Sequence, residues 1–195
     1  MPRISLPTPD TMTPEQLAVH QKVVSGPRGE IKGPLRAALH NAELADRWQA
    51  LGALLRYGTS MTPRQSELAI LVTGRHCRSP FEWFAHRPEG AKAGLSDDTL
   101  DDLLAQRQPR GLDATDQVIY RYALELNRSH SVSDATHAAA VQLLGEKGVV
   151  ELTALVGYYT MVAMTLNAHE IPLPEGVHPA FALPQHAGLN GMRAA

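Results

Sequence analysis

Apolar residues recur along this chain at helical spacing. The face of one predicted helix carries apolar residues three or four positions apart, namely Leu44, Trp48, Leu51 and Leu55. The segment from Leu68 to Val72 is apolar nearly all round, which is typical of a buried helix. No segment shows sustained alternation of apolar and polar positions, the pattern of a strand. The pattern therefore predicts an all-α helical bundle of about seven to nine helices.

Helix starts and breaks divide the pattern into elements. A threonine N-cap, a proline at the first helical position and a glutamine three residues after the cap occur at 13–16 and again at 62–65. Ser79 and Pro80 predict another start, because the residue before a proline avoids the α region. The predicted helices run from 14 to a break at 26–33, over 34–41 and 43–57, from 63 to before Pro80, from 80 to an end near 88–94, and over 97–104, 117–127, 135–144 and 149–167.

Prolines mark both ends of the chain. We expect an extended N-terminal arm over 1–12, a single domain over 13–171 and a proline-rich C-terminal tail over 172–195. The chain has 195 residues and 44% hydrophobic content, enough to bury one sizeable core. Either arm could reach a neighbouring subunit or stay loose.

Charge and hydropathy exclude several classes of protein. The 18 basic and 20 acidic residues give a net charge of −2. The chain has no run of lysines and arginines of the kind that nucleic-acid binding proteins carry. The N-terminus lacks the apolar core of a signal peptide. The most apolar run, 152–166, is shorter than the roughly 20 residues of a membrane span, so we interpret it as a buried helix. We expect a cytoplasmic protein with neither a membrane nor a nucleic-acid partner.

The segment from Ser79 to His86 concentrates the candidate chemistry. Glu82 and His86 are four residues apart, so a helix stacks them on one face among aromatic residues. Glu67 directly precedes the apolar run of its helix, where a carboxylate needs a partner or a proton. If Glu67 reaches His86, it could orient the imidazole. These residues suit proton transfer.

Each of these three residues also has a structural interpretation. Ser79 and Glu82 fit a capping box, in which the glutamate returns to the N–H of the cap residue. His86 could be a hydrogen-bonded core histidine. Glu67 could face solvent at a helix start, where the macrodipole favours a carboxylate.

Further residues could contact a substrate or a metal. Arg56 and Arg75 could clamp a carboxylate, although each alone is more typical of a solvated surface residue. Tyr158 sits on the last apolar helix and could line a pocket or pack in the core. Cys77, the only cysteine, excludes an intramolecular disulfide and a C-x-x-C pair, and is either a nucleophile or an inert thiol. No second histidine has metal-site spacing, so we expect no metal and no cofactor.

Three motifs together resemble a known family. They are Glu67-Leu68-Ala69-Ile70-Leu71, then Phe81-Glu82-Trp83-x-x-His86, then Ala91-x-x-Gly94-Leu95-Ser96. Over roughly residues 35 to 175 the chain resembles the carboxymuconolactone decarboxylase family, which shares its all-α fold with the AhpD-like alkylhydroperoxidases. The resemblance implies an AhpD-like bundle that assembles as a homotrimer or homohexamer.

The resemblance also assigns roles by position. In the redox branch a glutamate precedes C-x-x-C and a histidine, and Glu67 and His86 match that spacing. The cysteine positions fall on Ser79 and Glu82, so dithiol peroxidase chemistry has no thiols here. In the decarboxylase branch the motif is E-W-x-x-H, which Glu82, Trp83 and His86 match.

Three functional hypotheses follow. The first is a cofactor-independent lyase of aromatic catabolism that acts on a small lactone or carboxylated metabolite. In it His86 is the general acid/base, Glu82 shares the proton, Glu67 orients the imidazole and Trp83 shapes the pocket. The second is a peroxiredoxin-like reduction of peroxide by Cys77 with an external thiol. The third is a non-catalytic oligomeric binding protein.

Overall fold

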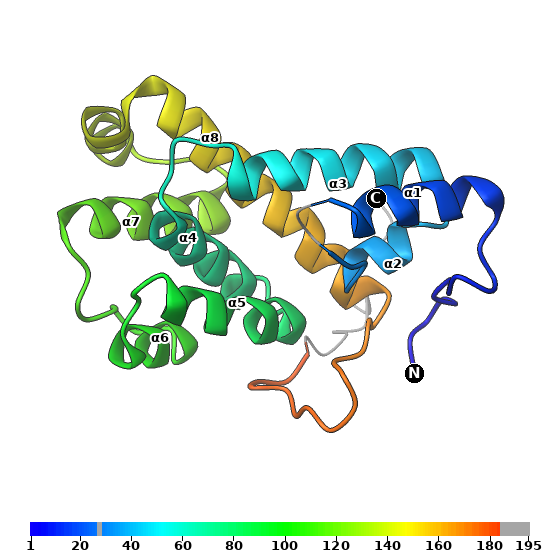
Figure 1. The fold of residues 1–195 in the computed structure, drawn as a ribbon. Coiled ribbons are helices and arrows are strands. Elements are labelled where there is room, and N and C mark those ends of the chain that lie inside the picture. The colour runs from blue at the N-terminus through cyan, green and yellow to red at the C-terminus, as the bar shows by residue number, and fades with distance from the viewer. Residues whose placement is uncertain (27–28, 184–195) are drawn as a thin grey trace, which may run out of the picture.

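The computed structural model describes residues 1–26 and 29–183, and within them the chain is all-α, with eight helices and no strand. The helices are α1 (Pro14–Val24), α2 (Pro34–Ala38), α3 (Ala42–Tyr57), α4 (Pro63–His76), α5 (Pro80–Lys92), α6 (Asp97–Leu104), α7 (Ala114–Ser129) and α8 (Asp134–Ala168) (Figure 1). The all-α fold and the number of helices expected from the sequence are confirmed.

The local start and stop signals act as the sequence predicts. Thr13 and Thr62 each accept a hydrogen bond from the backbone N–H of the glutamine three residues later, and that glutamine closes the capping box. The two helices predicted at 135–144 and 149–167 run on as one element, α8. Gly145 still marks their junction, because its φ of 69° and ψ of 169° are non-helical.

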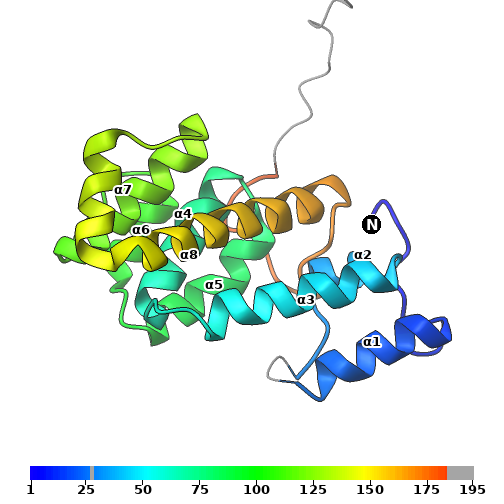
Figure 2. The same cartoon turned by 90° about the horizontal axis from the view of Figure 1, so that it is seen from above.

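Helix α4 lies at the centre of the bundle. Leu68, Ala69 and Ile70 are fully buried, and α4 packs against α5, α7 and α8 (Figure 2). Helix α3 crosses over α8 and carries Trp48 and Leu55 into the core. A helix that is apolar on all sides must be enclosed on all sides, which is why the segment after Glu67 occupies this central position.

Helix α8 is the one described helix that is long and apolar enough to cross a membrane by length and composition. Half of the most apolar 18-residue stretch of this helix is buried inside the bundle, and its buried face includes Leu152, Leu155 and Leu166. The helix packs against α4 and α7, as the core helix of a soluble protein does.

The N-terminal arm packs against its own chain. The backbone N–H of Arg3 donates to the carbonyl of His169 at 2.9 Å, and the His40 ring nitrogen Nε2 lies 2.7 Å from the carbonyl of Ser5. In the C-terminal tail, Phe181 lies against α5. Residues 184–195 of the expected tail lie outside the described part of the chain, and the domain boundaries drawn from the sequence stay predictions.

Candidate active site

Close packing of α5 on α4 brings three ionisable residues together. A Cβ atom added to Gly74 of α4 would lie 2.9 Å from the Cβ of Glu82 on α5. Only a glycine at position 74 leaves room for this approach. As a result Glu82 and His86 of α5 face Glu67 of α4 in the interior of the bundle.

The His86 ring lies between two carboxyl groups. Its Nδ1 is 2.7 Å from Oε2 of Glu67, a distance at which Nδ1–H donates a hydrogen bond to the carboxylate. Its Nε2 is 3.5 Å from Oε2 of Glu82. The exposed fractions of Glu67, Glu82 and His86 are 7%, 4% and 6%, so the cluster is nearly dry. With Nδ1 carrying its hydrogen toward Glu67, the lone pair of Nε2 faces Glu82.

Glu82 is the unusual member of the cluster. Burial raises the pKa of its carboxyl, although His86 and Arg56 favour the charged form. Among the described residues its Oε2 finds no hydrogen-bond partner. A carboxyl group of this kind keeps its proton to a higher pH than an exposed glutamate does. It can therefore serve as a proton donor next to an imidazole.

The structure decides between the alternative interpretations of these residues. The Ser79 side chain makes no capping hydrogen bond, so the capping box expected at Ser79 and Glu82 is wrong, although α5 does begin at Pro80. Glu67 is buried, so a solvent-facing position at the helix start is wrong too. His86 is a buried, paired histidine, but its partners are two carboxyl groups rather than one backbone carbonyl.

Arg56 connects the cluster to the surface. Its Nη2 lies 3.6 Å from Oε1 of Glu67, and its side chain is 22% exposed. Burial alone would lower the pKa of this guanidinium, but the neighbouring Tyr159, Tyr57 and Glu67 outweigh that effect and raise it. Arg56 is thus a fixed cation at the edge of the site, as the sequence suggested.

The tyrosine that contacts His86 is Tyr159, not Tyr158. The rings of Tyr159 and His86 meet edge to face with their centroids 5.1 Å apart. Tyr158 packs against Trp48 and Tyr159, so the ring of Tyr159 is the one in contact with His86. Burial raises the pKa of the Tyr159 hydroxyl well above its usual value, so it stays protonated. The two tyrosines are adjacent in sequence, and helical periodicity alone does not say which of them faces α5.

Two other expected substrate contacts meet Phe181 of the C-terminal tail. Trp83 is buried and packs against Phe181 of the tail, with ring centroids 6.4 Å apart. Arg75 lies two turns of α4 beyond Glu67, about 12 Å along the helix axis. Its Nε donates to the carbonyl of Leu104 at 2.7 Å, and its guanidinium stacks on Phe181. Among the described residues Arg75 thus contacts Leu104 and Phe181 rather than Glu67 or His86, and its role as a substrate clamp stays a prediction.

Cys77 lies at the end of α4, beside the cluster. Burial raises the pKa of its thiol, and Glu82 adds to that effect while Thr160 opposes it. The side-chain amide of Asn167 donates to the Cys77 carbonyl at 2.9 Å, while its own Oδ1 has no hydrogen-bond partner among the described residues. The sequence had not pointed to Asn167 as a site residue. A thiol with a raised pKa is mostly protonated at neutral pH and is a poor nucleophile.

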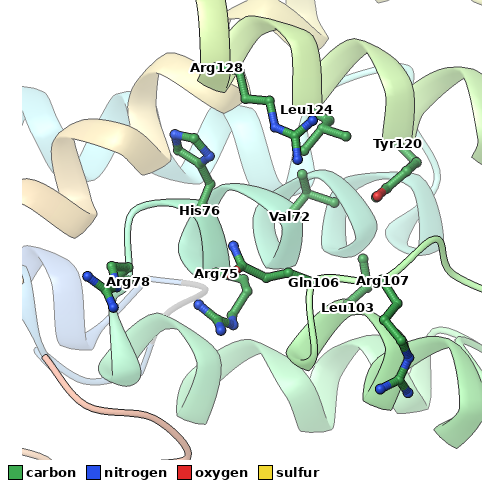
Figure 3. Close-up of a pocket in the computed structure, with 10 residues that line it drawn as sticks. All are labelled: Val72, Arg75, His76, Arg78, Leu103, Gln106, Arg107, Tyr120, Leu124 and Arg128. Atoms are coloured by element: carbon green, nitrogen blue, oxygen red, sulfur yellow. The ribbon is translucent and has the colours of Figure 1, made fainter. Parts of the chain in front are cut away.

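Within residues 1–26 and 29–183, no three histidine, cysteine, aspartate or glutamate side chains are placed so that they could hold a metal ion. A cavity in the described part of the chain lies apart from the Glu67–His86 cluster. It has a volume of about 330 Å³ and is lined from α4 by Val72, Arg75 and His76, but by none of the three cluster residues (Figure 3).

Comparison with known proteins shows the fold. No protein-family model and no curated protein matches the sequence. The structure is similar to the crystal structure of an uncharacterized peroxidase-related protein from Silicibacter sp. TM1040, with a TM-score of 0.72. The two chains are 16% identical, and the match covers 88% of this chain and 91% of that one. The similarity therefore extends over nearly the whole bundle.

Proposed function

We propose that this protein is a cofactor-independent acid/base enzyme, related to the carboxymuconolactone decarboxylases, that acts on a small lactone or carboxylated metabolite. The observation that carries the proposal is the His86 ring, held between the carboxyl groups of Glu67 and Glu82 in a nearly dry interior. A structural ion pair needs one partner. A histidine with a carboxyl group at each nitrogen can receive a proton on one side and be held in one tautomer by the other.

The roles follow from the two contacts of the ring. Glu67 accepts the hydrogen bond from Nδ1–H and so fixes the tautomer. Glu82, with its raised pKa, supplies a proton to Nε2. In a decarboxylation the substrate carboxylate leaves as CO2, and the electrons of the broken C–C bond move into the unsaturated lactone. A substrate carbon then takes the proton from Nε2, and solvent replaces the proton that was used.

Substrate binding is assigned to the edge of the cluster. Arg56 forms an ion pair with Glu67 and also reaches the surface, so it would hold a substrate carboxylate. Trp83 closes the site on the side of the tail and helps to exclude water. Tyr159 limits the space beside the imidazole.

The proposal is tested by measuring CO2 release from 4-carboxymuconolactone by the wild-type protein and by His86→Ala. We expect release by the wild type and a loss of roughly 10²- to 10⁴-fold in the variant, the usual contribution of a positioned general acid. Full activity of His86→Ala would refute the mechanism. If the wild type releases no CO2 but His86→Ala abolishes turnover of another lactone or keto acid, the substrate assignment fails while the role of His86 stands.

A peroxide-reducing function is the second candidate, favoured by the description of the similar structure as peroxidase-related. It would have to use Cys77, whose pKa is raised by burial. Treatment with hydrogen peroxide followed by mass spectrometry distinguishes the two functions. We expect Cys77 to remain a thiol, and formation of sulfenic acid at Cys77 would favour the peroxidase.

We also propose that the protein acts as a homo-oligomer, a trimer or a hexamer, in the cytoplasm. The support is an exposed face of α8 that carries no charge over more than four turns: Val150, Thr153, Ala154, Gly157, Met161, Met164 and Ala168. Helix α3, which contacts α8, exposes Leu51 and Leu54 as well. Exposed apolar surface of this extent is typical of an interface, and small residues such as Gly157 allow a second helix to approach closely.

A further inference from the structure

A cavity separate from the Glu67–His86 cluster lies between α4, α7 and the end of α6. Its volume is about 330 Å³, which is in the range of small-molecule sites. Its lining combines apolar and uncharged polar residues with five basic ones, which are Arg75, His76, Arg78, Arg107 and Arg128. In Figure 3 the Arg128 side chain extends from α7 toward Val72, with His76 and Tyr120 on either side of it.

The positive charge of this cavity is largely uncompensated. Arg107 is neutralised, because its guanidinium binds Asp102 at 2.7 Å. In the described part of the chain, no carboxylate forms an ion pair with Arg75, Arg78 or Arg128. This is unusual here, because most other arginines of the described chain, such as Arg64 and Arg110, have an aspartate or glutamate partner.

The basic groups repel one another. Burial lowers the pKa of Arg75 and the charge of Arg78 lowers it further. Burial lowers the pKa of His76, and Arg128 and His130 add to the effect. Carbonyl groups at the C-terminal ends of α4 and α7 offset a part of this charge, since Arg75 and Arg128 lie in the last turns of these helices. The helix ends do not explain why both cations border the same cavity.

The floor of the cavity is apolar. Val72 and Leu103 are buried, and Leu124 and Tyr120 are half-buried beside them. A ligand that fits this site therefore has an acidic group for the arginines and an apolar or aromatic body for the floor. A simple inorganic anion would leave the apolar floor uncovered.

We propose that this cavity binds a small organic anion, with Arg128 holding its acidic group and Val72, Leu103 and Leu124 contacting its apolar body, while Arg75 adds positive charge at the rim. The acidic group is a carboxylate or a phosphate ester, because the planar guanidinium pairs with either. This site is independent of the proposed reaction, since it shares no residue with the Glu67–His86 cluster.

Isothermal titration calorimetry with benzoate, phenyl phosphate and uncharged benzamide tests the proposal. We expect saturable binding of benzoate or of phenyl phosphate by the wild type, and the tighter of the two identifies the acidic group. Benzamide should bind at least tenfold more weakly than that anion, because it has the ring without the charge. No saturable binding of either anion, or equal binding of benzamide, would overturn the site.

The location is tested with a matched pair of variants on α7. Arg128→Gln removes an exposed cation that lines the cavity, and Arg121→Gln removes an exposed cation that does not. We expect Arg128→Gln to weaken anion binding by about tenfold, the effect of one charge-assisted hydrogen bond, and Arg121→Gln to change it by less than about twofold. Equal effects of the two variants would refute the location. His86→Gln should leave the binding unchanged, so failure of the proposed reaction and failure of this site are distinguishable.

Discussion

Replacing Glu82 with glutamine should slow the enzyme and stabilise the fold at the same time. Burial raises the pKa of Glu82, so the folded protein binds its proton more tightly than the unfolded chain does. Between the ordinary pKa of 4.5 and the raised value, the folded state holds more protons, and the free energy of unfolding therefore falls as the pH rises. Below pH 4.5 the Glu82 carboxyl is protonated in both the folded and the unfolded state, and the loss of stability disappears.

The size of the effect follows from the same linkage. Each pH unit between the two pKa values costs about 1.4 kcal/mol. His86 and Arg56 oppose the effect, because both favour the charged form of the carboxyl. Glutamine has nearly the shape of protonated glutamate and cannot ionise. We expect Glu82→Gln to raise the free energy of unfolding at pH 7.5 by about 1–3 kcal/mol, because it removes the cost of an ionised buried oxygen, Oε2, that has no hydrogen-bond partner among the described residues. In a chain of this size that corresponds to roughly 2–12 °C in Tm.

The assay is urea denaturation of wild type and Glu82→Gln at intervals between pH 4 and pH 8. The two stabilities should agree at the acid end and separate as the pH rises. Glu89→Gln is the matched control, because Glu89 is on the same helix and close to solvent. A Glu82→Gln protein that is less stable than the wild type at pH 7.5, or a difference that does not change with pH, would refute the reasoning.

Three further changes test other parts of the structure. Gly74→Ala should destabilise the protein by about 1–3 kcal/mol in urea, because its Cβ would meet that of Glu82 at 2.9 Å; a gain in stability from helix propensity alone would contradict this packing. Cys77→Ser should retain turnover of the substrate, because the thiol transfers no proton in the proposed mechanism; loss of turnover would favour thiol chemistry. Met164→Lys should dissociate the oligomer in size-exclusion chromatography with light scattering, because Met164 is 62% exposed on the uncharged face of α8; an unchanged mass would place the interface elsewhere.

The helices were largely predictable because their signals are local. The capping boxes at Thr13 and Thr62, the proline before α5 and the apolar faces of α3 and α4 each depend on a few neighbouring residues. The contact between Glu67 and His86 was predictable as well. A carboxylate beside an apolar run needs a partner, and the family resemblance suggests His86 as that partner. Charge alone suggested both Arg56 and Arg75, and the structure places Arg56 beside Glu67.

The remaining features depend on how helices meet, which one sequence does not specify. Ser79 and Glu82 have the spacing of a capping box, but the close approach at Gly74 turns Glu82 inward. Adjacent residues of a helix point about 100° apart around its axis, and of the two tyrosines on α8 it is Tyr159 rather than Tyr158 that contacts His86. Arg75 shares a helix with Glu67, yet two turns separate them and it lines a different cavity. Gly74, the one glycine of α4, was the available signal for this approach.

The most direct test of the proton relay is the state of the His86 ring, which nitrogen-15 NMR reports without any substrate. In the wild type we expect the neutral ring to carry its hydrogen on Nδ1, because Glu67 accepts from it at 2.7 Å. In Glu67→Gln this preference should weaken, and in Glu82→Gln the Nε2 signal should shift while Nδ1 stays protonated. A ring with its hydrogen on Nε2 in the wild type, indifferent to both substitutions, would contradict the arrangement on which the proposed chemistry depends.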